Sequence, residues 1–262
     1  MAWFKRSSRI KILVTILGVV FTLLLAFNIP ARVQAQLQAD EITNKLPNNW
    51  DFTPPSIPGE SLPDNRQGGA SRGNECIQGD ANEKLTALAP FSVGETVAES
   101  PTIFWYLPKS SASQIDLLLQ VAQEEDVNIY SAKYTLPKST DGFVEGSPGI
   151  MSLTLPTLNN VSLLKTGQTY QWSLQLICKL NESSKNPWVL GRIKRVQSDK
   201  NLAFRISQAT PQERVGISAD AKLWYETLSA LVELRRTLPN SNVTDAWNKL
   251  FKSVGLDNIA QK

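Results

Sequence analysis

The sequence has 262 residues, which is enough for one large domain or two small ones. A hydrophobic content of 42% allows a buried core, and the net charge of +3 comes without the clustered Lys and Arg of nucleic-acid-binding proteins. The sequence contains no histidine, which excludes Ser-His-Asp and Cys-His catalysis and most zinc and haem sites. We therefore expect no cofactor, no metal ion and no nucleic-acid partner.

Residues 1–35 have the pattern of a secretory signal peptide. The start is basic through Lys5, Arg6, Arg9 and Lys11, and residues 12–27 form an apolar run. Small residues then predict cleavage between Ala35 and Gln36. In the alternative interpretation the run is kept as a membrane anchor. Either way, we expect the folded part outside the cytoplasm, in the periplasm, in the cell envelope or secreted.

Residues 36–75 show neither the helical nor the strand period, and they contain five prolines and a glycine-rich run at 68–73. This composition is typical of a disordered Pro/Gly-rich linker. We interpret the segment as a spacer between the signal peptide and the folded domain.

Short strand signals recur from residue 76 to residue 198, which predicts a β-sandwich domain. The predicted strands cover residues 85–88, 102–108, 114–122, 127–136, 149–155, 169–180 and 188–196. The clearest is 169–180, in which aromatic and aliphatic residues alternate with Gln, Ser and Lys from Tyr170 onward. This period of two is typical of a strand that is buried on one face.

Leu164, Gly167 and Tyr170 have the spacing of a tyrosine corner, the turn that enters the penultimate strand of immunoglobulin-like sandwiches. Trp105, three residues before Pro108, is similar to the core tryptophan of fibronectin type III domains. The predicted fold class is therefore mostly β: an immunoglobulin- or fibronectin-III-like sandwich, followed by a C-terminal α-helical segment.

Residues 199–262 change to a helical pattern and form a predicted helical cap. Thr210 and Glu213 are spaced as a capping box with a proline at the first helical position, and Gly216 is expected to end that helix. Residues 219–238 predict an amphipathic helix that stops at Pro239.

Asn242 is predicted to cap a final helix, and Gly255 with Leu256 fits a Schellman stop. These helices need an apolar surface to cover. The strand at 102–108 offers one, because Phe104 and Tyr106 point away from the face that carries Trp105. We expect the helices to pack on that patch or on a partner protein.

Cys76 and Cys178 are the only cysteines, and in an exported chain they predict a disulfide. The alternative is two separate buried thiols. A disulfide would leave no thiolate nucleophile, so the enzyme classes that remain use pairs of carboxylates or Ser-Lys dyads.

Two charged clusters have competing interpretations. The acidic run at 124–126 is either a calcium site or, in our preferred interpretation, a solvated hairpin turn. The basic run at 192–195 alternates as an exposed strand face. It would contact acidic glycans or lipid headgroups, or serve only as a solubilising edge, which we favour.

Several motifs occur together along the chain. They are Gly-x-x-Cys at 73–76, Ser-Pro-Thr-Ile-Phe-Trp-Tyr-Leu-Pro at 100–108, Pro-Gly-Ile at 148–150, Gly-x-x-Tyr-x-Trp-Ser-Leu-x-x-Ile-Cys at 167–178, Ala-Thr-Pro at 209–211, Trp-Tyr at 224–225, Leu-x-x-Leu-Arg-Arg at 231–236 and Val-Gly-Leu at 254–256. In this combination the chain resembles a secreted cyanobacterial family, domain of unknown function 928 (DUF928). The resemblance implies an extracytoplasmic protein and no particular activity.

These features predict a non-catalytic module that binds an envelope protein or a glycan. A carboxylate-based hydrolase of envelope glycans is the alternative, and it requires two carboxyl groups that face each other across a cleft at about 5–10 Å. In a third interpretation the chain is a membrane-anchored assembly subunit, attached through an uncleaved residue 1–35 segment.

Overall fold

The computed structural model describes residues 46–47, 50–52, 65–68, 76–79, 83–122, 127–179 and 186–262. They belong to one compact unit, residues 45–262. The predicted cleavage between Ala35 and Gln36 and the acidic run at 124–126 lie outside the described residues. Within them, no helix has the length and apolar character that crossing a bilayer requires.

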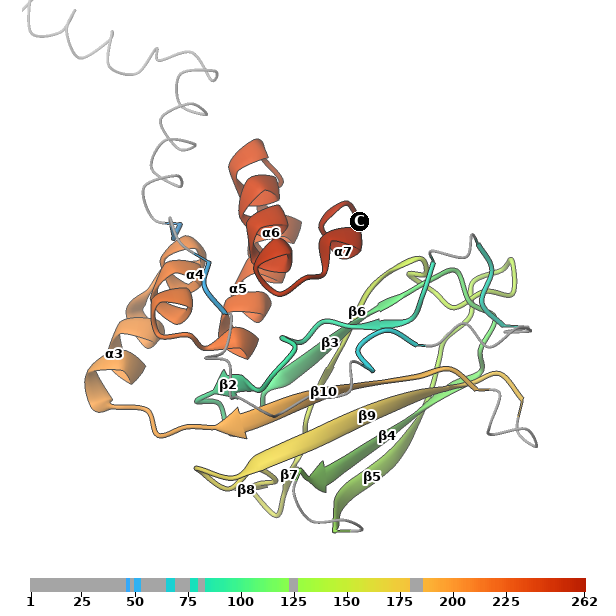
Figure 1. Cartoon of the computed structure of the whole chain (residues 1–262), viewed down its shortest axis with the longest axis horizontal. Coiled ribbons are helices and arrows are strands. Elements are labelled where there is room, and N and C mark those ends of the chain that lie inside the picture. Colours follow the sequence, from blue (N-terminus) through green and yellow to red (C-terminus); the bar gives the residue numbers. More distant parts are fainter. Residues whose placement is uncertain are drawn as a thin grey trace, which may run out of the picture. The chain divides into compact units, whose positions relative to one another are not determined.

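The described strands form two main sheets and one hairpin (Figure 1). The three-stranded sheet has the order β1 (Thr86–Ala87), β3 (Thr102–Leu107), β6 (Gly149–Thr154). The five-stranded sheet has the order β2 (Gly94–Thr96), β10 (Trp188–Arg195), β9 (Thr169–Ile177), β4 (Gln114–Val121), β5 (Asn128–Thr135). The hairpin consists of β7 (Thr157–Leu158) and β8 (Val161–Ser162). All seven predicted strands are present; β2, β7 and β8 were not predicted.

Strand β9 confirms the alternating pattern. Its apolar face, from Tyr170 to Leu176, is buried, while Gln171 and Gln175 on the other face are partly exposed. β9 pairs antiparallel with both β10 and β4, so it lies in the middle of the sheet. Just before it, the Tyr170 hydroxyl accepts a hydrogen bond from the Lys165 backbone N–H at 3.0 Å, which confirms the tyrosine corner.

Five helices follow the sheets, so the fold is mixed rather than mostly β. They are α3 (Lys200–Gln208), α4 (Pro211–Asp220), α5 (Trp224–Thr237), α6 (Ser241–Ser253) and α7 (Asp257–Ala260). The short helices α3 and α7 were not predicted. No residue of α3 is buried, and its Phe204 is 65% exposed.

The capping box at Thr210 and Glu213 is confirmed in both directions, by bonds of 2.9 and 3.4 Å. The prediction that Gly216 ends the helix is wrong. A glycine often ends a helix because it adopts the left-handed backbone conformation there. After α4 the residue with that conformation is Lys222, with φ +57°. Gly216 lies buried inside α4, and α5 begins only at Trp224.

The cap of α6 lies two residues earlier than predicted. Asn240, not Asn242, accepts the Val243 backbone N–H at 2.9 Å, because the helix begins at Ser241. The predicted stop is confirmed: Gly255 has φ +70°, and the Leu256 N–H donates to the Phe251 carbonyl at 2.9 Å.

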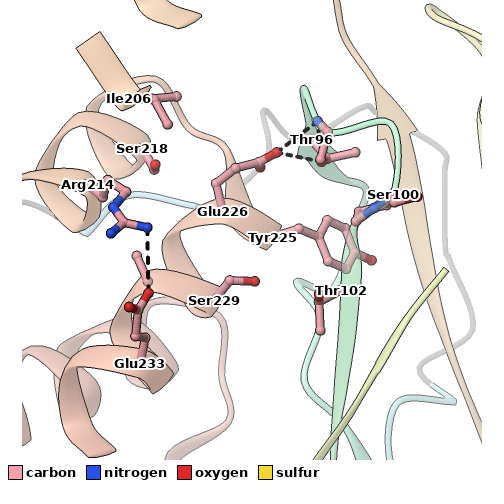
Figure 2. Close-up of a pocket in the computed structure, with 13 residues that line it drawn as sticks. Thr96, Ser100, Thr102, Ile206, Arg214, Ser218, Tyr225, Glu226, Ser229 and Glu233 are labelled. Atoms are coloured by element: carbon pink, nitrogen blue, oxygen red, sulfur yellow. Dashed lines mark hydrogen bonds and ion pairs between the residues drawn. The ribbon is translucent and has the colours of Figure 1, made fainter. Parts of the chain in front are cut away.

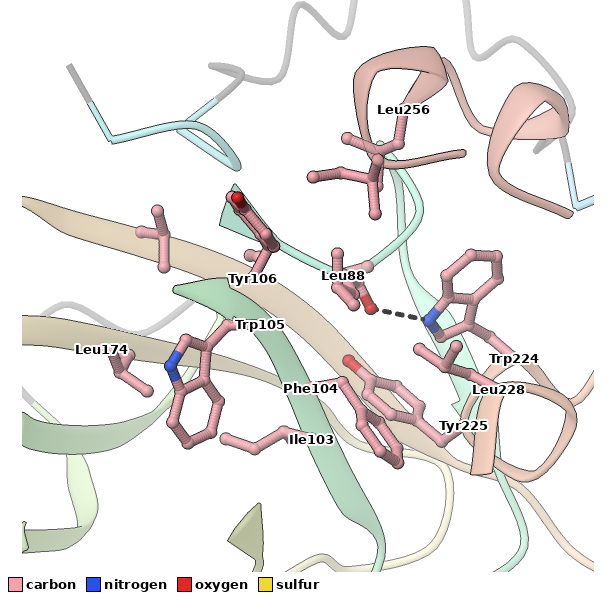
Figure 3. Close-up of a cluster of buried hydrophobic side chains, with 14 of the residues drawn as sticks. Leu88, Ile103, Phe104, Trp105, Tyr106, Leu174, Trp224, Tyr225, Leu228 and Leu256 are labelled. Carbon is pink, nitrogen blue, oxygen red and sulfur yellow. Dashed lines mark hydrogen bonds between the residues drawn. The ribbon is translucent and has the colours of Figure 1, made fainter. Parts of the chain in front are cut away.

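Helix α5 packs on the outer patch of β3, as expected (Figure 3). Phe104 points toward α5, whereas Trp105 points toward Leu174 of the five-stranded sheet. Trp224 of α5 is fully buried, and its indole N–H donates to the Leu88 carbonyl at 3.0 Å. The core thus includes both sheets and the helices.

Tyr225, the second residue of α5, packs against the five-stranded sheet. Its hydroxyl accepts from the Trp172 indole at 2.9 Å and donates to the Arg192 carbonyl at 3.0 Å. A Cβ on Gly94 would lie 2.8 Å from the Tyr225 ring, so β2 needs glycine there. Burial and nearby Glu226 raise the pKa of Tyr225, so the phenol stays protonated.

Two pieces of the predicted linker are part of the folded unit. Trp50 and Phe52 are buried, and the Phe52 ring meets Trp224 edge-on at 5.2 Å. Arg66 donates to the Val254 carbonyl at 2.7 Å. The spacer interpretation therefore does not hold for Trp50 and Phe52, whose aromatic side chains bury apolar surface, or for Arg66, which is buried and bonded to the end of α6.

A disulfide joins Cys76 to Cys178, with 5.4 Å between the Cα atoms. Cys76 lies in a short segment that pairs with residues 109–111, and Cys178 follows the end of β9. The bond therefore ties residues 76–79 to the five-stranded sheet, as the cysteine count predicts.

Candidate functional site

A cavity of about 240 Å³ lies between the residues that join β2 to β3 and the helices α3, α4 and α5 (Figure 2). The polar groups of its lining come mainly from hydroxyls, two carboxyl groups and one guanidinium. The lining residues are Thr96, Ala98, Ser100, Pro101, Thr102, Ile206, Arg214, Ser218, Tyr225, Glu226, Ser229, Ala230 and Glu233. We call this cavity the α5 pocket.

Glu226 holds the wall of the α5 pocket together. Its Oε1 accepts three hydrogen bonds from the chain after β2: from the Thr96 hydroxyl at 2.6 Å, the Val97 N–H at 2.9 Å and the Ala98 N–H at 3.1 Å. Thr96 in turn accepts from the Ala98 N–H at 3.1 Å. This arrangement, the Glu226 clasp, fixes the β2–β3 connection on the first turn of α5.

The second oxygen of Glu226 is used differently. Oε2 is buried, and no described residue hydrogen-bonds to it. Burial raises the pKa of the Glu226 carboxyl, although the hydrogen bonds from Thr96, Val97 and Ala98 oppose the shift. Glu226 therefore keeps its proton to a higher pH than an exposed glutamate, and it presents one unsatisfied oxygen.

Arg214 contributes a second unsatisfied atom. One terminal nitrogen lies 3.6 Å from Oε2 of Glu233. The Nε–H of the same guanidinium is buried and has no partner among the described residues. Arg214 and Glu226 both line the α5 pocket, and each carries one buried polar atom without a partner among the described residues. Native proteins contain few such atoms.

The two carboxyl groups do not have the geometry of a glycosidase. Glu226, Ser229 and Glu233 follow one side of α5 (Figure 2), and seven residues of helix separate the two glutamates by about 10 Å along the axis. They line the same wall rather than opposite walls of a cleft. The described residues also hold no group of three or more Asp, Glu or Cys side chains placed to bind a metal ion.

The basic run at 192–195, which the sequence analysis singled out, does not line the α5 pocket. Arg195 pairs with Glu99 at 2.8 Å and donates to the Leu164 carbonyl at 3.3 Å. Arg192 takes part in the fold through its carbonyl, which accepts from Tyr225. Sequence analysis missed Arg214, Glu226 and Glu233. Glu226 is an acidic residue in a first helical turn, which is common, and the contacts of all three residues join separate elements of the chain.

A family model described as Domain of Unknown Function (DUF928) matches residues 67–262. No curated protein matches the chain, and neither does any solved structure. The matched span contains all ten described strands and the whole lining of the α5 pocket.

Proposed function

The chain belongs to the family of Domain of Unknown Function 928, whose description gives no activity, so we propose a function from the α5 pocket. We propose that the protein is an exported, non-catalytic module that binds a polar group of an envelope protein or glycan. One observation carries the proposal. Glu226 and Arg214 both line the α5 pocket, and Oε2 of the first and Nε of the second are buried without a partner among the described residues.

The energetic argument rests on what such atoms cost. A buried polar group without a partner costs about 1–3 kcal/mol of stability. A ligand that reached both atoms would recover that cost on binding, which supports the proposal of a polar ligand. The Glu226 clasp supports this role, since it holds the wall in place before the ligand arrives.

Two features support an extracytoplasmic location. Residues 1–35 have the signal-peptide pattern, with cleavage proposed between Ala35 and Gln36. The Cys76–Cys178 disulfide suits an oxidising compartment. Together with the resemblance to a secreted cyanobacterial family, they favour the periplasm or cell envelope of a cyanobacterium.

We also infer that the two sheets form an immunoglobulin-like sandwich. The order β1-β3-β6 corresponds to strands A, B and E, and β10-β9-β4-β5 corresponds to G, F, C and C′. The tyrosine corner before β9 falls where this assignment places strand F. Such scaffolds carry many binding functions, which fits a module better than an enzyme.

Capture from native envelopes tests the proposal. The full chain is the bait, and crosslinked proteins and glycans are analysed in the same eluate. We expect a stoichiometric partner that the Arg214→Gln variant loses and that the matched control Arg236→Gln, a change at an exposed residue of α5, retains. Equal capture by the two variants would contradict a role for the α5 pocket.

One observation favours the alternative of a carboxylate-based hydrolase: Glu226, whose pKa is raised, shares a cavity with Glu233. An enzyme would release shortened envelope glycan, and Glu226→Gln would abolish the release. Recovery of intact glycan supports the module instead.

The third interpretation, an anchored assembly subunit, depends on the N-terminus. Sequencing of the exported chain decides it: a start at Gln36 excludes the anchor, whereas a retained residue 1–35 segment supports it.

A further inference from the structure

We propose that the end of the molecule formed by the β7–β8 hairpin and helix α3 docks on a lipid bilayer that carries anionic headgroups. We call this end the hairpin–α3 surface. Its members are the apolar side chains of Leu158, Val161 and Phe204 and the basic side chains of Lys165, Lys200 and Arg205. This inference is separate from the α5 pocket and does not depend on the function proposed there.

The β7–β8 hairpin holds two aliphatic side chains at its tip. Leu158 lies directly opposite Val161, so both side chains are on one face of the hairpin. Between them, Asn159 and Asn160 both have left-handed backbone, with φ +50° and +62°, which is typical of a tight two-residue turn. Leu158 is 51% exposed and Val161 is 66% exposed. The turn thus presents a pair of apolar side chains to the solvent.

Helix α3 adds an aromatic side chain. Its Ile206 lines the α5 pocket, and residues two positions apart on a helix lie on nearly opposite sides. Phe204 therefore faces away from the α5 pocket, and it is 65% exposed. A single exposed apolar residue is ordinary on a protein surface. Here the three most exposed large apolar side chains of the described residues are Phe204 and the pair at the hairpin tip.

The contacts of Arg195 place the hairpin and α3 at the same end of the molecule. Arg195 pairs with Glu99 at 2.8 Å and donates to the Leu164 carbonyl, just after β8, at 3.3 Å. The Ser162 hydroxyl of β8 donates to the Glu99 carbonyl at 2.6 Å. β10 ends at Arg195 and α3 begins soon after it, at Lys200. Figure 1 shows β8 and α3 toward the same side of the molecule.

The basic side chains of this surface favour an anionic partner. Lys165 follows the hairpin, and Lys200 and Arg205 belong to α3. All three residues are exposed, and none forms an ion pair with another described residue. Basic side chains beside apolar ones are what a negatively charged bilayer surface attracts.

The acidic residues described at this end have partners. Glu99 pairs with Arg195, and Asp199 caps α3 by accepting the Leu202 N–H at 2.6 Å. Val127, which is 39% exposed, follows the acidic run at 124–126. That run lies outside the described residues, so we do not include Val127 in the surface.

The arrangement of the apolar side chains favours a bilayer over a protein partner. They come from two separate elements, a hairpin tip and a helix, with basic residues beside each. A protein partner buries one continuous, closely packed patch. A lipid interface is fluid, so it surrounds each apolar side chain separately while the headgroups contact the basic residues.

Vesicle flotation tests the inference. The sample is the chain from Gln36 onward, which keeps the compact unit 45–262 and lacks the apolar run at 12–27, since that run would bind lipid by itself. The vesicles consist of phosphatidylcholine, alone or mixed with phosphatidylglycerol. We expect about tenfold stronger binding to the mixed vesicles, because the basic side chains gain from the negative surface potential. High salt should remove that advantage.

Variants of the apolar side chains locate the binding. Leu158→Ser and Phe204→Ser should each weaken binding to the mixed vesicles about tenfold, because each removes one apolar anchor. Both residues are more than half exposed, so the unfolding curves should stay close to that of the wild type. The matched control is Trp188→Ser. Trp188 is 43% exposed and begins β10, at the opposite end of that strand from Arg195, so this variant should bind as the wild type does.

A charge variant tests the headgroup class. Lys200→Gln should reduce the preference for the mixed vesicles and leave binding to phosphatidylcholine alone unchanged. The control Arg236→Gln, a change at an exposed residue of α5, should leave both unchanged.

Four results would overturn the inference: no binding to either kind of vesicle, equal binding to both kinds, an equal loss in Trp188→Ser, or a loss in neither Leu158→Ser nor Phe204→Ser. If no vesicle binds and Leu158→Ser converts a dimer to a monomer in light scattering, the surface contacts a second copy of the chain instead. None of these results changes the capture experiment with Arg214→Gln, so the two proposals fail independently.

Discussion

Glu226 and Glu83 both link the C-terminal part of the chain to the strand region, but the pKa values of the two carboxyl groups are shifted in opposite directions. Glu226 lines the α5 pocket and forms no ion pair with another described residue, and burial raises the pKa of its carboxyl group. Glu83 accepts hydrogen bonds from the ammonium group of Lys262 and from the Tyr106 hydroxyl, the latter at 2.6 Å. These bonds, that from Lys262 first, lower the pKa of Glu83. We call Glu83, Tyr106 and Lys262 the C-terminal clasp.

The difference separates a structural carboxylate from a candidate binding group. Both oxygens of Glu83 have partners within the protein, so the C-terminal clasp is complete without a ligand. Glu226 concentrates three hydrogen bonds on one oxygen and leaves the other unsatisfied among the described residues. The same residue type thus stabilises the fold in one place and lines the proposed binding pocket in the other.

The largest expected effect on stability comes from the buried residues around Glu226. Trp224→Ala, next to the Glu226 clasp, should lower the free energy of unfolding by about 3–5 kcal/mol, because it empties a fully buried site between Leu88 and Phe52. Denaturant unfolding measures it. The control Trp188→Ala removes a side chain that is 43% exposed and should cost far less. Similar losses for both would contradict the burial argument.

Tyr225→Phe should have the next largest effect, a loss of about 1–3 kcal/mol. The change leaves the Trp172 indole N–H and the Arg192 carbonyl without their partner at a buried position. Tyr106→Phe is the matched change in the C-terminal clasp, and it should cost only about 0.5–1.5 kcal/mol because Glu83 keeps its bond to Lys262. If Tyr106→Phe lowers the free energy of unfolding by more than Tyr225→Phe does, the hydroxyl of Tyr225 does not contribute more to stability than that of Tyr106.

The same contrast explains which features could be predicted from the sequence. Strand β9, the tyrosine corner at Tyr170 and the capping box at Thr210 depend on residues within a few positions of one another, and all three are present. The stop at Gly255 is equally local. Periodicity and capping rules describe such neighbourhoods well.

The features that were missed depend on distant contacts. β2 is three residues long and forms only because β10 pairs with it in parallel. Trp50 and Phe52 look like part of a proline-rich spacer until Trp224 lies beside them. The α5 pocket needs Thr96 next to Glu226, 130 residues further along the chain. No local pattern contains that pairing.

The next effect is smaller and appears in the pH dependence. Glu226 has a folded-state pKa above its usual value of 4.5, so the stability linked to its proton is complete below pH 4.5 and is lost as the pH rises through the folded pKa. Glu226→Gln cannot lose a proton. We therefore expect the variant to gain stability relative to the wild type from pH 4 to pH 8, in unfolding curves at each pH. A difference that does not change with pH, or that changes in the opposite direction, would show that burial does not control this carboxyl group.

The smallest effect should come from Glu83, and its sign is reversed. The folded pKa lies below the usual 4.5, so the stabilisation is complete above pH 4.5 and disappears as the pH falls through the folded value. Glu83→Gln should cost about 0.2–1 kcal/mol at pH 7, because the side chains of Glu83 and Lys262 are 24% and 35% exposed and water screens the pair. The loss should shrink in acid and in high salt. Lys262→Gln should reproduce it, and the double variant should lose little more than either single one. A loss of stability that persists at low pH would mean that Glu83 stabilises the fold through packing and not through its charge.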